Sequence, residues 1–162
     1  MKLISSIITS FFLVLFSLTH ASACENITVQ NAWIREAPPT INVMAGYLDI
    51  ENSSDKELIL LAAESDEYER IEFHQSQIEN GVARMQKQDE IIIAPNSTFS
   101  FTPGGFHLMM FNPSSPMREG KVTSIKLIFK GGDKAGDKGD KTHTFEAMVK
   151  RSDSTESHEH HH

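Results

Sequence analysis

Apolar and polar residues alternate along much of this chain, which is the pattern of strands with one buried face. Residues 43–50 alternate, with one face formed by Met44, Gly46, Leu48 and Ile50 and the other by Val43, Ala45, Tyr47 and Asp49. Residues 122–129 alternate in the same way, through Ile125, Leu127 and Phe129. Because successive side chains of a strand point to opposite faces, both segments are predicted to be half-buried strands.

Further short strands are predicted over 58–63, 68–77, 82–86, 90–93, 98–102, 106–111 and 142–149, and residues 27–35 are read as a strand pair or one interrupted strand. Asn80-Gly81 separates two of them and predicts a tight hairpin, since both residues readily adopt positive φ angles. No segment shows a sustained helical period. About eight short strands with regular turns indicate a single all-β domain, a sandwich or barrel.

The first residues form an export signal rather than part of the domain. A basic start at Lys2 precedes the uncharged run 4–18, which is too short to span a membrane, and Ala21-Ser22-Ala23 fits a cleavage site. We therefore predict a signal peptide over 1–23, a β-barrel domain over 24–150 and a disordered tail over 151–162. Cys24 becomes the new N-terminus and is also a candidate for lipidation.

The net charge and the cysteine content exclude several classes of function. The formal charge of −7 becomes −8 when Lys2 is removed with the signal, which argues against nucleic acid or anionic membranes as partners. With Cys24 as the only cysteine, the chain can form neither an intrachain disulfide nor a thiolate copper site. No phosphate-binding loop or nucleophilic triad can be inferred, so we expect a binding protein and not an enzyme.

Candidate metal chemistry begins after the turn Gly104-Gly105, where His107 and Met109 lie two residues apart. In a strand these two side chains share a face, and an imidazole with a thioether suits a soft ion such as Cu(I). We expect the glycines to let the pair emerge at the rim of the barrel. His74 and Met85, on the two arms of the predicted hairpin, are the further candidates, because antiparallel arms bring such residues close.

Most other sulfur and aromatic side chains are given a structural role. A single methionine in an apolar strand usually fills a gap in the core, which we expect for Met44, Met110 and Met148. Met117 is expected to be a loop residue with a further sulfur to offer. We predict that Trp33 belongs to the core, and that His143 is structural or exposed.

The four candidate donors have a distinctive spacing. Ten residues separate His74 from Met85, twenty-one separate Met85 from His107, and Leu108 alone separates His107 from Met109. This pattern resembles that of the periplasmic copper chaperone family PCu(A)C. The surrounding blocks are also similar, over about residues 27–150: Ala32-Trp33-Ile34-Arg35, Gly46-Tyr47-Leu48 and Pro103-Gly104-Gly105-Phe106. Some members have a further methionine just after the first histidine, where this chain has Gln75-Ser76-Gln77.

The resemblance implies a fold and a function. The fold would be a cupredoxin-like Greek-key β-sandwich or barrel, and the metal would be one Cu(I) held by His74, Met85, His107 and Met109 in a periplasmic monomer. The implied partners are cytochrome c oxidase subunit II, whose CuA centre receives the copper, and a Sco-type copper protein. We expect His107 and Met109 to form the rigid half of the site and the His74/Met85 hairpin the adaptable half.

The C-terminal tail supports an alternative function. His158, His160, His161 and His162 lie in a polar segment with nothing to bury, and such tracts bind metal loosely. The tail could hold Cu(II) in addition to the Cu(I) site. In the alternative, the protein buffers or stores metal in the periplasm through this tail and has no dedicated recipient.

Overall fold

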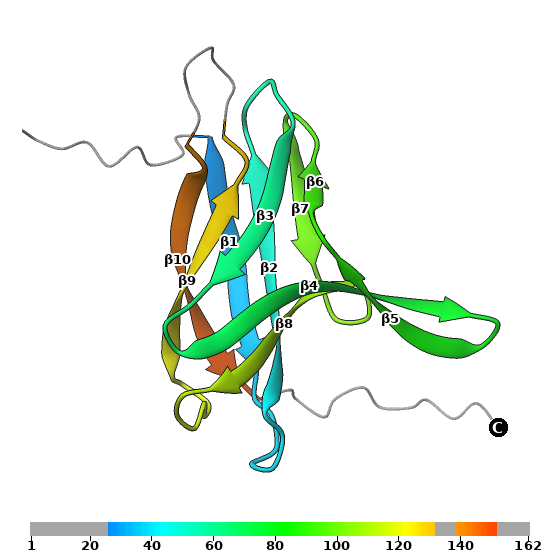
Figure 1. Ribbon diagram of the computed structural model, residues 1–162, viewed down its shortest axis with the longest axis vertical. Coiled ribbons are helices and arrows are strands. Elements are labelled where there is room, and N and C mark those ends of the chain that lie inside the picture. Colours follow the sequence, from blue (N-terminus) through cyan, green and yellow to red (C-terminus); the bar gives the residue numbers. More distant parts are fainter. Residues whose placement is uncertain (1–25, 132–138, 152–162) are drawn as a thin grey trace, which may run out of the picture.

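The computed structural model describes residues 26–131 and 139–151, and all regular secondary structure within these ranges is β-strand (Figure 1). The strands are β1 (Ile27–Arg35), β2 (Val43–Asn52), β3 (Leu58–Glu64), β4 (Tyr68–Glu79), β5 (Val82–Gln88), β6 (Ile91–Ile93), β7 (Ser97–Phe101), β8 (Phe106–Pro113), β9 (Val122–Phe129) and β10 (Lys141–Lys150). The prediction of an all-β domain is confirmed, and each of the ten segments predicted as strands overlaps one of these ten, although we expected about eight strands in total. No helix in the described ranges could cross a membrane. The signal peptide, Cys24 and the histidine tail lie outside these ranges.

The strands form one sheet in the order β5-β4-β8-β2-β1-β10-β9-β3-β6, and β7 also pairs with β2. β2 is central, because one edge pairs with β1 while the other pairs with β8 and then with β7. β6 pairs with β3 at the end of the order, and β7 follows directly along the chain and pairs with β2. The sheet therefore curls around the core, and β7 closes it by pairing with the central strand β2. This closure leaves few strand edges unpaired.

The first strand confirms the reading of one interrupted strand. Its register on β2 shifts between Gln30 and Trp33, and Asn31 has a φ of 53°. Such a bulge inserts a residue and redirects the side chains that follow. Trp33 consequently lies on the outside of the sheet, packed on Tyr47, and the prediction that it belongs to the core is wrong.

The inner face of the sheet is a continuous apolar core. The alternation in β2 and β9 is confirmed, since one of the two predicted faces of each strand is buried: Met44, Leu48, Ile50, Ile125, Leu127 and Phe129. Met110 is fully buried, as predicted. Met117 does lie in a loop, but it is only 4% exposed and packs in the core, so it offers no outer sulfur. Met148 is 45% exposed because its neighbours Ala147 and Val149 take the inner face of β10, and its assignment to the core is wrong.

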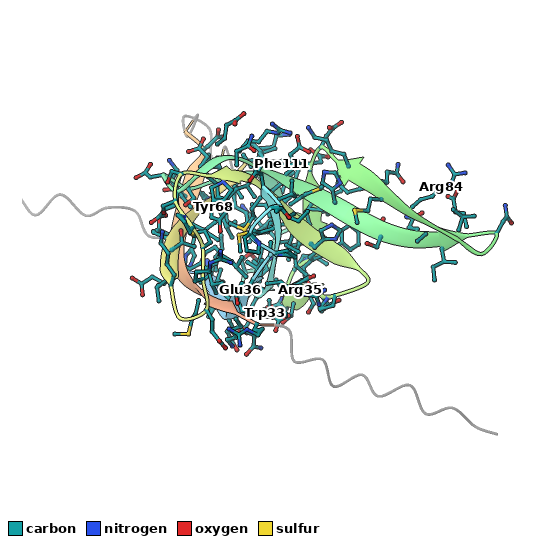
Figure 2. All side chains as sticks on the ribbon, turned by 90° about the horizontal axis from the view of Figure 1, so that it is seen from below. Trp33, Arg35, Glu36, Tyr68, Arg84 and Phe111 are labelled. Atoms are coloured by element: carbon teal, nitrogen blue, oxygen red, sulfur yellow. The ribbon has the colours of Figure 1, made fainter. Side chains whose placement is uncertain are left out.

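The predicted Asn80-Gly81 hairpin is confirmed as the turn between β4 and β5. Both residues have positive φ angles, 52° and 80°, and Glu79 pairs with Val82 across the turn. The hairpin extends sideways from the body as an arm (Figure 1), and β5 is exposed along nearly its whole length. Figure 2 shows Arg84 far out on this arm. The arm carries apolar side chains in contact with water, notably Ile78 and Val82.

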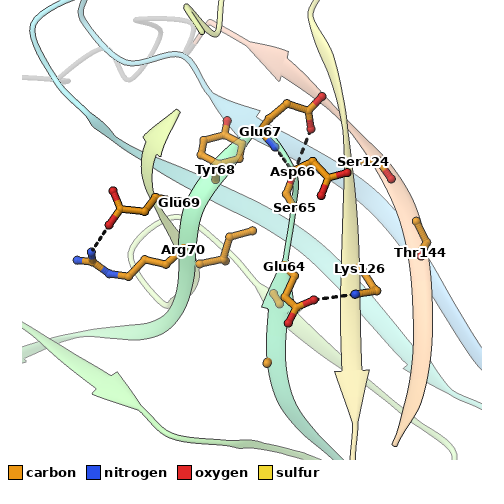
Figure 3. A pocket seen from close by; sticks show the side chains of 13 residues that line it. Glu64, Ser65, Asp66, Glu67, Tyr68, Glu69, Arg70, Ser124, Lys126 and Thr144 are labelled. Atoms are coloured by element: carbon orange, nitrogen blue, oxygen red, sulfur yellow. Dashed lines mark hydrogen bonds and ion pairs between the residues drawn. The ribbon is translucent and has the colours of Figure 1, made fainter. Parts of the chain in front are cut away.

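A buried threonine meets a partly buried glutamate where the turn between β3 and β4 lies against β9. Thr123 on the inner face of β9 donates a hydrogen bond to Glu67, and Ser65 donates a second one to the same oxygen at 3.1 Å. Figure 3 shows Glu67 and Ser65 beside the hollow that these elements border, together with the Glu64–Lys126 ion pair. The Thr123 hydrogen bond is the main reason why the pKa of Glu67 is lowered.

Replacing Thr123 by Val should therefore destabilise the fold in a pH-dependent way. Loss of a hydrogen bond to a charged group should lower the free energy of unfolding by about 1–2 kcal/mol near neutral pH. Because the folded-state pKa of Glu67 is lowered, this stabilisation is complete above the unfolded-state pKa of about 4.3 and disappears as the pH falls through the folded-state value. Urea unfolding at neutral and acidic pH measures the difference, and Thr98→Val at an exposed position of β7 is the matched control. A pH-independent difference would contradict the assignment.

Candidate metal centre

The antiparallel pairing of β4 and β8 places His74 directly opposite His107. Their ring centroids are 6.0 Å apart. The two histidines lie on the face of these strands that points away from the core, here called the outer face. Residues paired in this way are the closest side-chain neighbours that a sheet provides. Two residues that are thirty-three positions apart in the sequence are thus brought to a distance that one metal ion could bridge.

The two methionines lie on the same outer face. Met109 is two residues beyond His107 on β8 and pairs with Glu72 of β4. Met85 on β5 pairs with Ser76, which is two residues beyond His74 on β4, so Met85 is a diagonal neighbour of His74. Diagonal neighbours in a sheet are separated by about 7–8 Å, within reach of a long side chain. The structure therefore brings the four sequence candidates to one patch on β5, β4 and β8, while their role as ligands stays a prediction.

The four candidates differ sharply in exposure to solvent. His107 is only 6% exposed, His74 and Met109 are partly buried, and Met85 is 64% exposed. The expectation that His107 emerges at the rim is therefore wrong, because its side chain is almost fully buried. The accessible side of the patch is the arm that carries Met85. The turn before β8 is as predicted, since Gly104 has a φ of 80°, which favours glycine.

His107 is held in a neutral, oriented state. Its Nδ1 lies 3.2 Å from the carbonyl oxygen of Gly105, which can only accept a hydrogen bond, so Nδ1 carries the proton. The Nε2 lone pair is then free for a metal ion. Burial lowers the pKa of His107; the hydrogen bond to Gly105 opposes this shift, and the neighbouring His74 adds to it, so the net change is downward. A neutral imidazole with a fixed orientation is the form that binds metal ions.

In His74 the roles of the two ring nitrogens are reversed. Its Nε2 lies 2.9 Å from Glu72, while its Nδ1 is buried without a hydrogen-bond partner. An orphaned buried nitrogen is unusual, because buried polar atoms are nearly always satisfied, and such an atom on the same sheet face as two thioethers and a second imidazole fits a metal ligand. Chiefly through the hydrogen bond from His74, and also through Lys87 and Arg70, the pKa of Glu72 is lowered to about 2.

The donor set favours a soft metal ion. Among residues 26–131 and 139–151, no cluster of three His, Cys, Asp or Glu side chains could hold an ion. The patch instead offers two neutral imidazoles and two thioethers. Hard ions such as Mg²⁺ and Ca²⁺ need oxygen ligands, whereas thioether sulfur selects Cu(I).

Sequence reasoning missed the residues that flank the patch. Tyr47 lies on the outer face of β2, two residues from Ala45, and Ala45 pairs with Met109. Trp33 packs on Tyr47 with ring centroids 4.7 Å apart, and the guanidinium of Arg35 lies over both rings. Figure 2 shows Trp33 and Arg35 side by side at the surface of the body. The alternation in 43–50 already assigned Tyr47 to this face, and Glu72 could have been found by its spacing of two from His74.

A family model and two curated relatives match this chain. A family model described as "Putative lipoprotein LpqE-like" matches residues 27–136. A putative lipoprotein of Leifsonia xyli subsp. xyli is 26% identical over 115 residues, covering 70% of this chain and 68% of the relative. An uncharacterized protein of Rickettsia prowazekii is 33% identical over 100 residues, covering 57% of this chain and 55% of that protein.

Solved structures show the same fold. The copper-bound PCuAC domain from PmoF2 is similar with a TM-score of 0.61 at 23% identity, covering 78% of this chain and 93% of that domain. The solution structure of Cu(I)-DR1885 from Deinococcus radiodurans has a TM-score of 0.61 at 22% identity, covering 83% and 84%. The predicted cupredoxin-like architecture is thereby confirmed. The chain therefore belongs to the LpqE-like family and has the fold of PCuAC domains.

Proposed function

We propose that this protein is a copper chaperone that binds one Cu(I) through His74, Met85, His107 and Met109 and delivers it toward the CuA centre of cytochrome c oxidase. The observation that carries the proposal is the directly paired His74 and His107, with Met109 and Met85 on the same outer face. The copper-bound PCuAC domain and Cu(I)-DR1885, both with this fold, support copper as the metal.

The chemistry of the patch supports delivery rather than permanent retention. All four donors are neutral, so the positive charge of Cu(I) is not cancelled by a ligand, and no thiolate adds its high affinity. Met85 is 64% exposed on the projecting arm, where a ligand of an incoming protein can replace it. Buried His107 would keep its hold on the ion until a second donor has arrived. The His74/Met85 hairpin would then be the adaptable half of the site.

The exported location follows from the leader sequence and the relatives. Both the matching family description and the Leifsonia relative carry the word lipoprotein, which supports an exported protein. We place the mature protein in the periplasm, with Cys24 as the residue that would carry a lipid. Its role would be to bind and deliver metal, without catalysing a reaction. Subunit II of the oxidase and a Sco-type protein are the proposed partners.

Removal of the two thioethers should weaken copper binding. A Met85→Ala, Met109→Ala double variant should lose at least about 100-fold in Cu(I) affinity, since even residues that only support a ligand contribute 10–100-fold. Competition titration with a chromophoric Cu(I) chelator measures the loss. Met148→Ala, which removes an exposed methionine of β10 outside the patch, is the matched control and should bind as the unaltered protein does. Undiminished affinity in the double variant would refute the ligand assignment.

Delivery can be separated from storage by a transfer experiment. The Cu(I)-loaded protein should transfer its ion to an apo fragment of oxidase subunit II, alone or with a Sco-type protein, as measured by the copper content of the fragment after the two proteins are separated. A truncated chain that ends at Arg151 should still hold one tightly bound Cu(I) and transfer it equally well, because the four donors precede the tail. Failure of transfer under both conditions, with loss of most metal capacity on truncation, would favour buffering by the histidine tail.

A further inference from the structure

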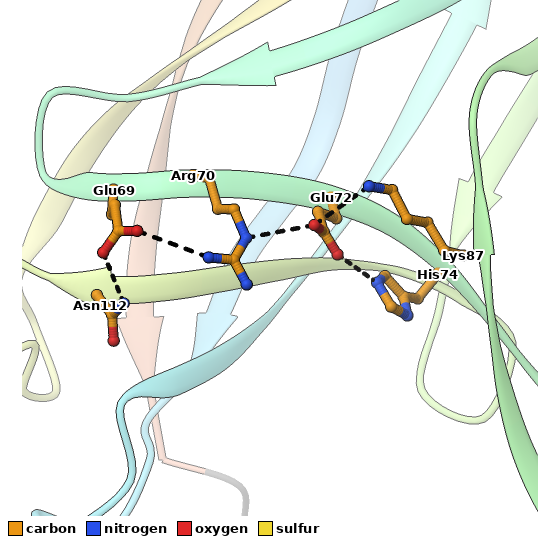
Figure 4. Close-up of polar contacts among 6 residues, drawn as sticks. All are labelled: Glu69, Arg70, Glu72, His74, Lys87 and Asn112. Atoms are coloured by element: carbon orange, nitrogen blue, oxygen red, sulfur yellow. Dashed lines mark hydrogen bonds and ion pairs between the residues drawn. The ribbon is translucent and has the colours of Figure 1, made fainter.

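Glu72 occupies the centre of a polar network on the outer face of β4 (Figure 4). One carboxylate oxygen lies 2.9 Å from Nε2 of His74. The other accepts from Lys87 at 3.2 Å and from Arg70 at 3.3 Å. Its side chain is only 19% exposed, and it pairs across the sheet with Met109. Glu72 therefore touches one candidate ligand and faces another.

The hydrogen bond to Glu72 determines which nitrogen His74 can offer. An ionised carboxylate can only accept, so Nε2 carries the proton and Nδ1 carries the lone pair. Nδ1 is the nitrogen that is buried without a partner. The opposite holds for His107, whose Nδ1 donates to the Gly105 carbonyl and whose Nε2 is therefore the free nitrogen. The two facing rings thus carry their lone pairs on different nitrogens, Nδ1 in His74 and Nε2 in His107.

We propose that Glu72 is a positioning residue that holds His74 in the Nε2–H tautomer, so that His74 presents Nδ1 and His107 presents Nε2 to the copper ion. This inference rests on the proposed function, because it concerns the same site. Glu72 itself is not a ligand. Its role is to orient one, and a carboxylate behind an imidazole also raises the basicity of the nitrogen that binds the metal.

Lys87 and Arg70 hold the carboxylate of Glu72 in the orientation that contacts His74. Lys87 and Arg70 both contact Oε1, which leaves Oε2 directed at His74. Arg70 is itself fixed, since its guanidinium lies 3.8 Å from the ring centroid of Phe111. Lys87 pairs with His74 across the β4–β5 ladder and lies two residues from Met85. The Glu72–Lys87 ion pair therefore also fastens the strand that bears Met85 to the strand that bears His74.

A purely structural role for this ion-pair network gives different expectations from a positioning role. Surface ion pairs contribute little to stability, so a structural Glu72 could be replaced with small effects on the fold and none on the histidine. A positioning residue instead controls the tautomer of His74 even when no metal is bound. The state of the His74 ring in the metal-free protein is therefore the decisive quantity.

The test compares Glu72→Val, which keeps a strand-forming side chain without an acceptor, with the unaltered protein. Long-range ¹H–¹⁵N correlation spectra of the metal-free protein at about pH 8, above the usual histidine pKa, distinguish the two tautomers. We expect His74 to be Nε2–H in the unaltered protein and mixed or Nδ1–H in the variant. His107 should be unchanged in both, because its partner is a backbone carbonyl. Cu(I) affinity of the variant should fall by about 10–100-fold.

Two further variants complete the test. Glu69→Val removes a neighbouring carboxylate that contacts Arg70 but not His74, and it should change neither the tautomer nor the affinity. Glu72→Gln serves if the valine variant does not fold, because an amide at this position competes as donor and acceptor and should also mix the tautomers.

The possible outcomes separate the two proposals. An unaltered protein with His74 as Nδ1–H, or a Glu72 variant with unchanged tautomer or unchanged affinity, would overturn the positioning role while leaving copper binding intact. If the unaltered protein shows the expected tautomer but binds no Cu(I), the proposed function fails instead.

Discussion

The register between β4 and β8 is the constraint on which the rest of the site depends. On the inner face Phe73 pairs with Leu108 and Ile71 with Met110, and three of these four side chains are buried in the core. Because side chains alternate with a period of two, a slip of one residue would turn this apolar set into water and the histidines into the core. The hydrophobic effect on one face of the sheet therefore sets the positions of the metal donors on the other.

The site combines a fixed part with an exposed one. His107 is anchored at the start of β8 by the Gly105 carbonyl and by burial, which also lowers its pKa and keeps the imidazole neutral. Met85 lies at the other extreme, on an arm whose strand β5 is exposed along nearly its whole length. Exposure thus increases across the patch from β8 to β5. For an ion that has to be both held and passed on, this gradient supplies a firm ligand and a replaceable one within the same sheet.

Local sequence patterns were sufficient for the strands, for the hairpin and for placing His107 and Met109 on one strand face. Alternation is a property of a few consecutive residues, as in Ile125, Leu127 and Phe129, and the Asn80-Gly81 turn depends on the φ angles of two residues. The spacing of two between His107 and Met109 likewise places both on one face of any strand. These features needed no knowledge of distant parts of the chain, and the structure agrees with them.

Contacts between distant segments decided what the sequence left open. A bulge at Asn31 turned Trp33 outward, and the loop after β8 placed Met117 in the core. Met148 is exposed because the face of β10 that packs against the core is the one that carries Ala147 and Val149. The Lys87–Glu72 ion pair likewise formed only because β5 lies alongside β4, whereas the His74–Glu72 contact joins residues two positions apart on one strand. The sequence by itself determined which side chains share a strand face. Only the tertiary structure decided which face is buried and which donors meet, because burial depends on the strands that pack alongside and not on the local pattern.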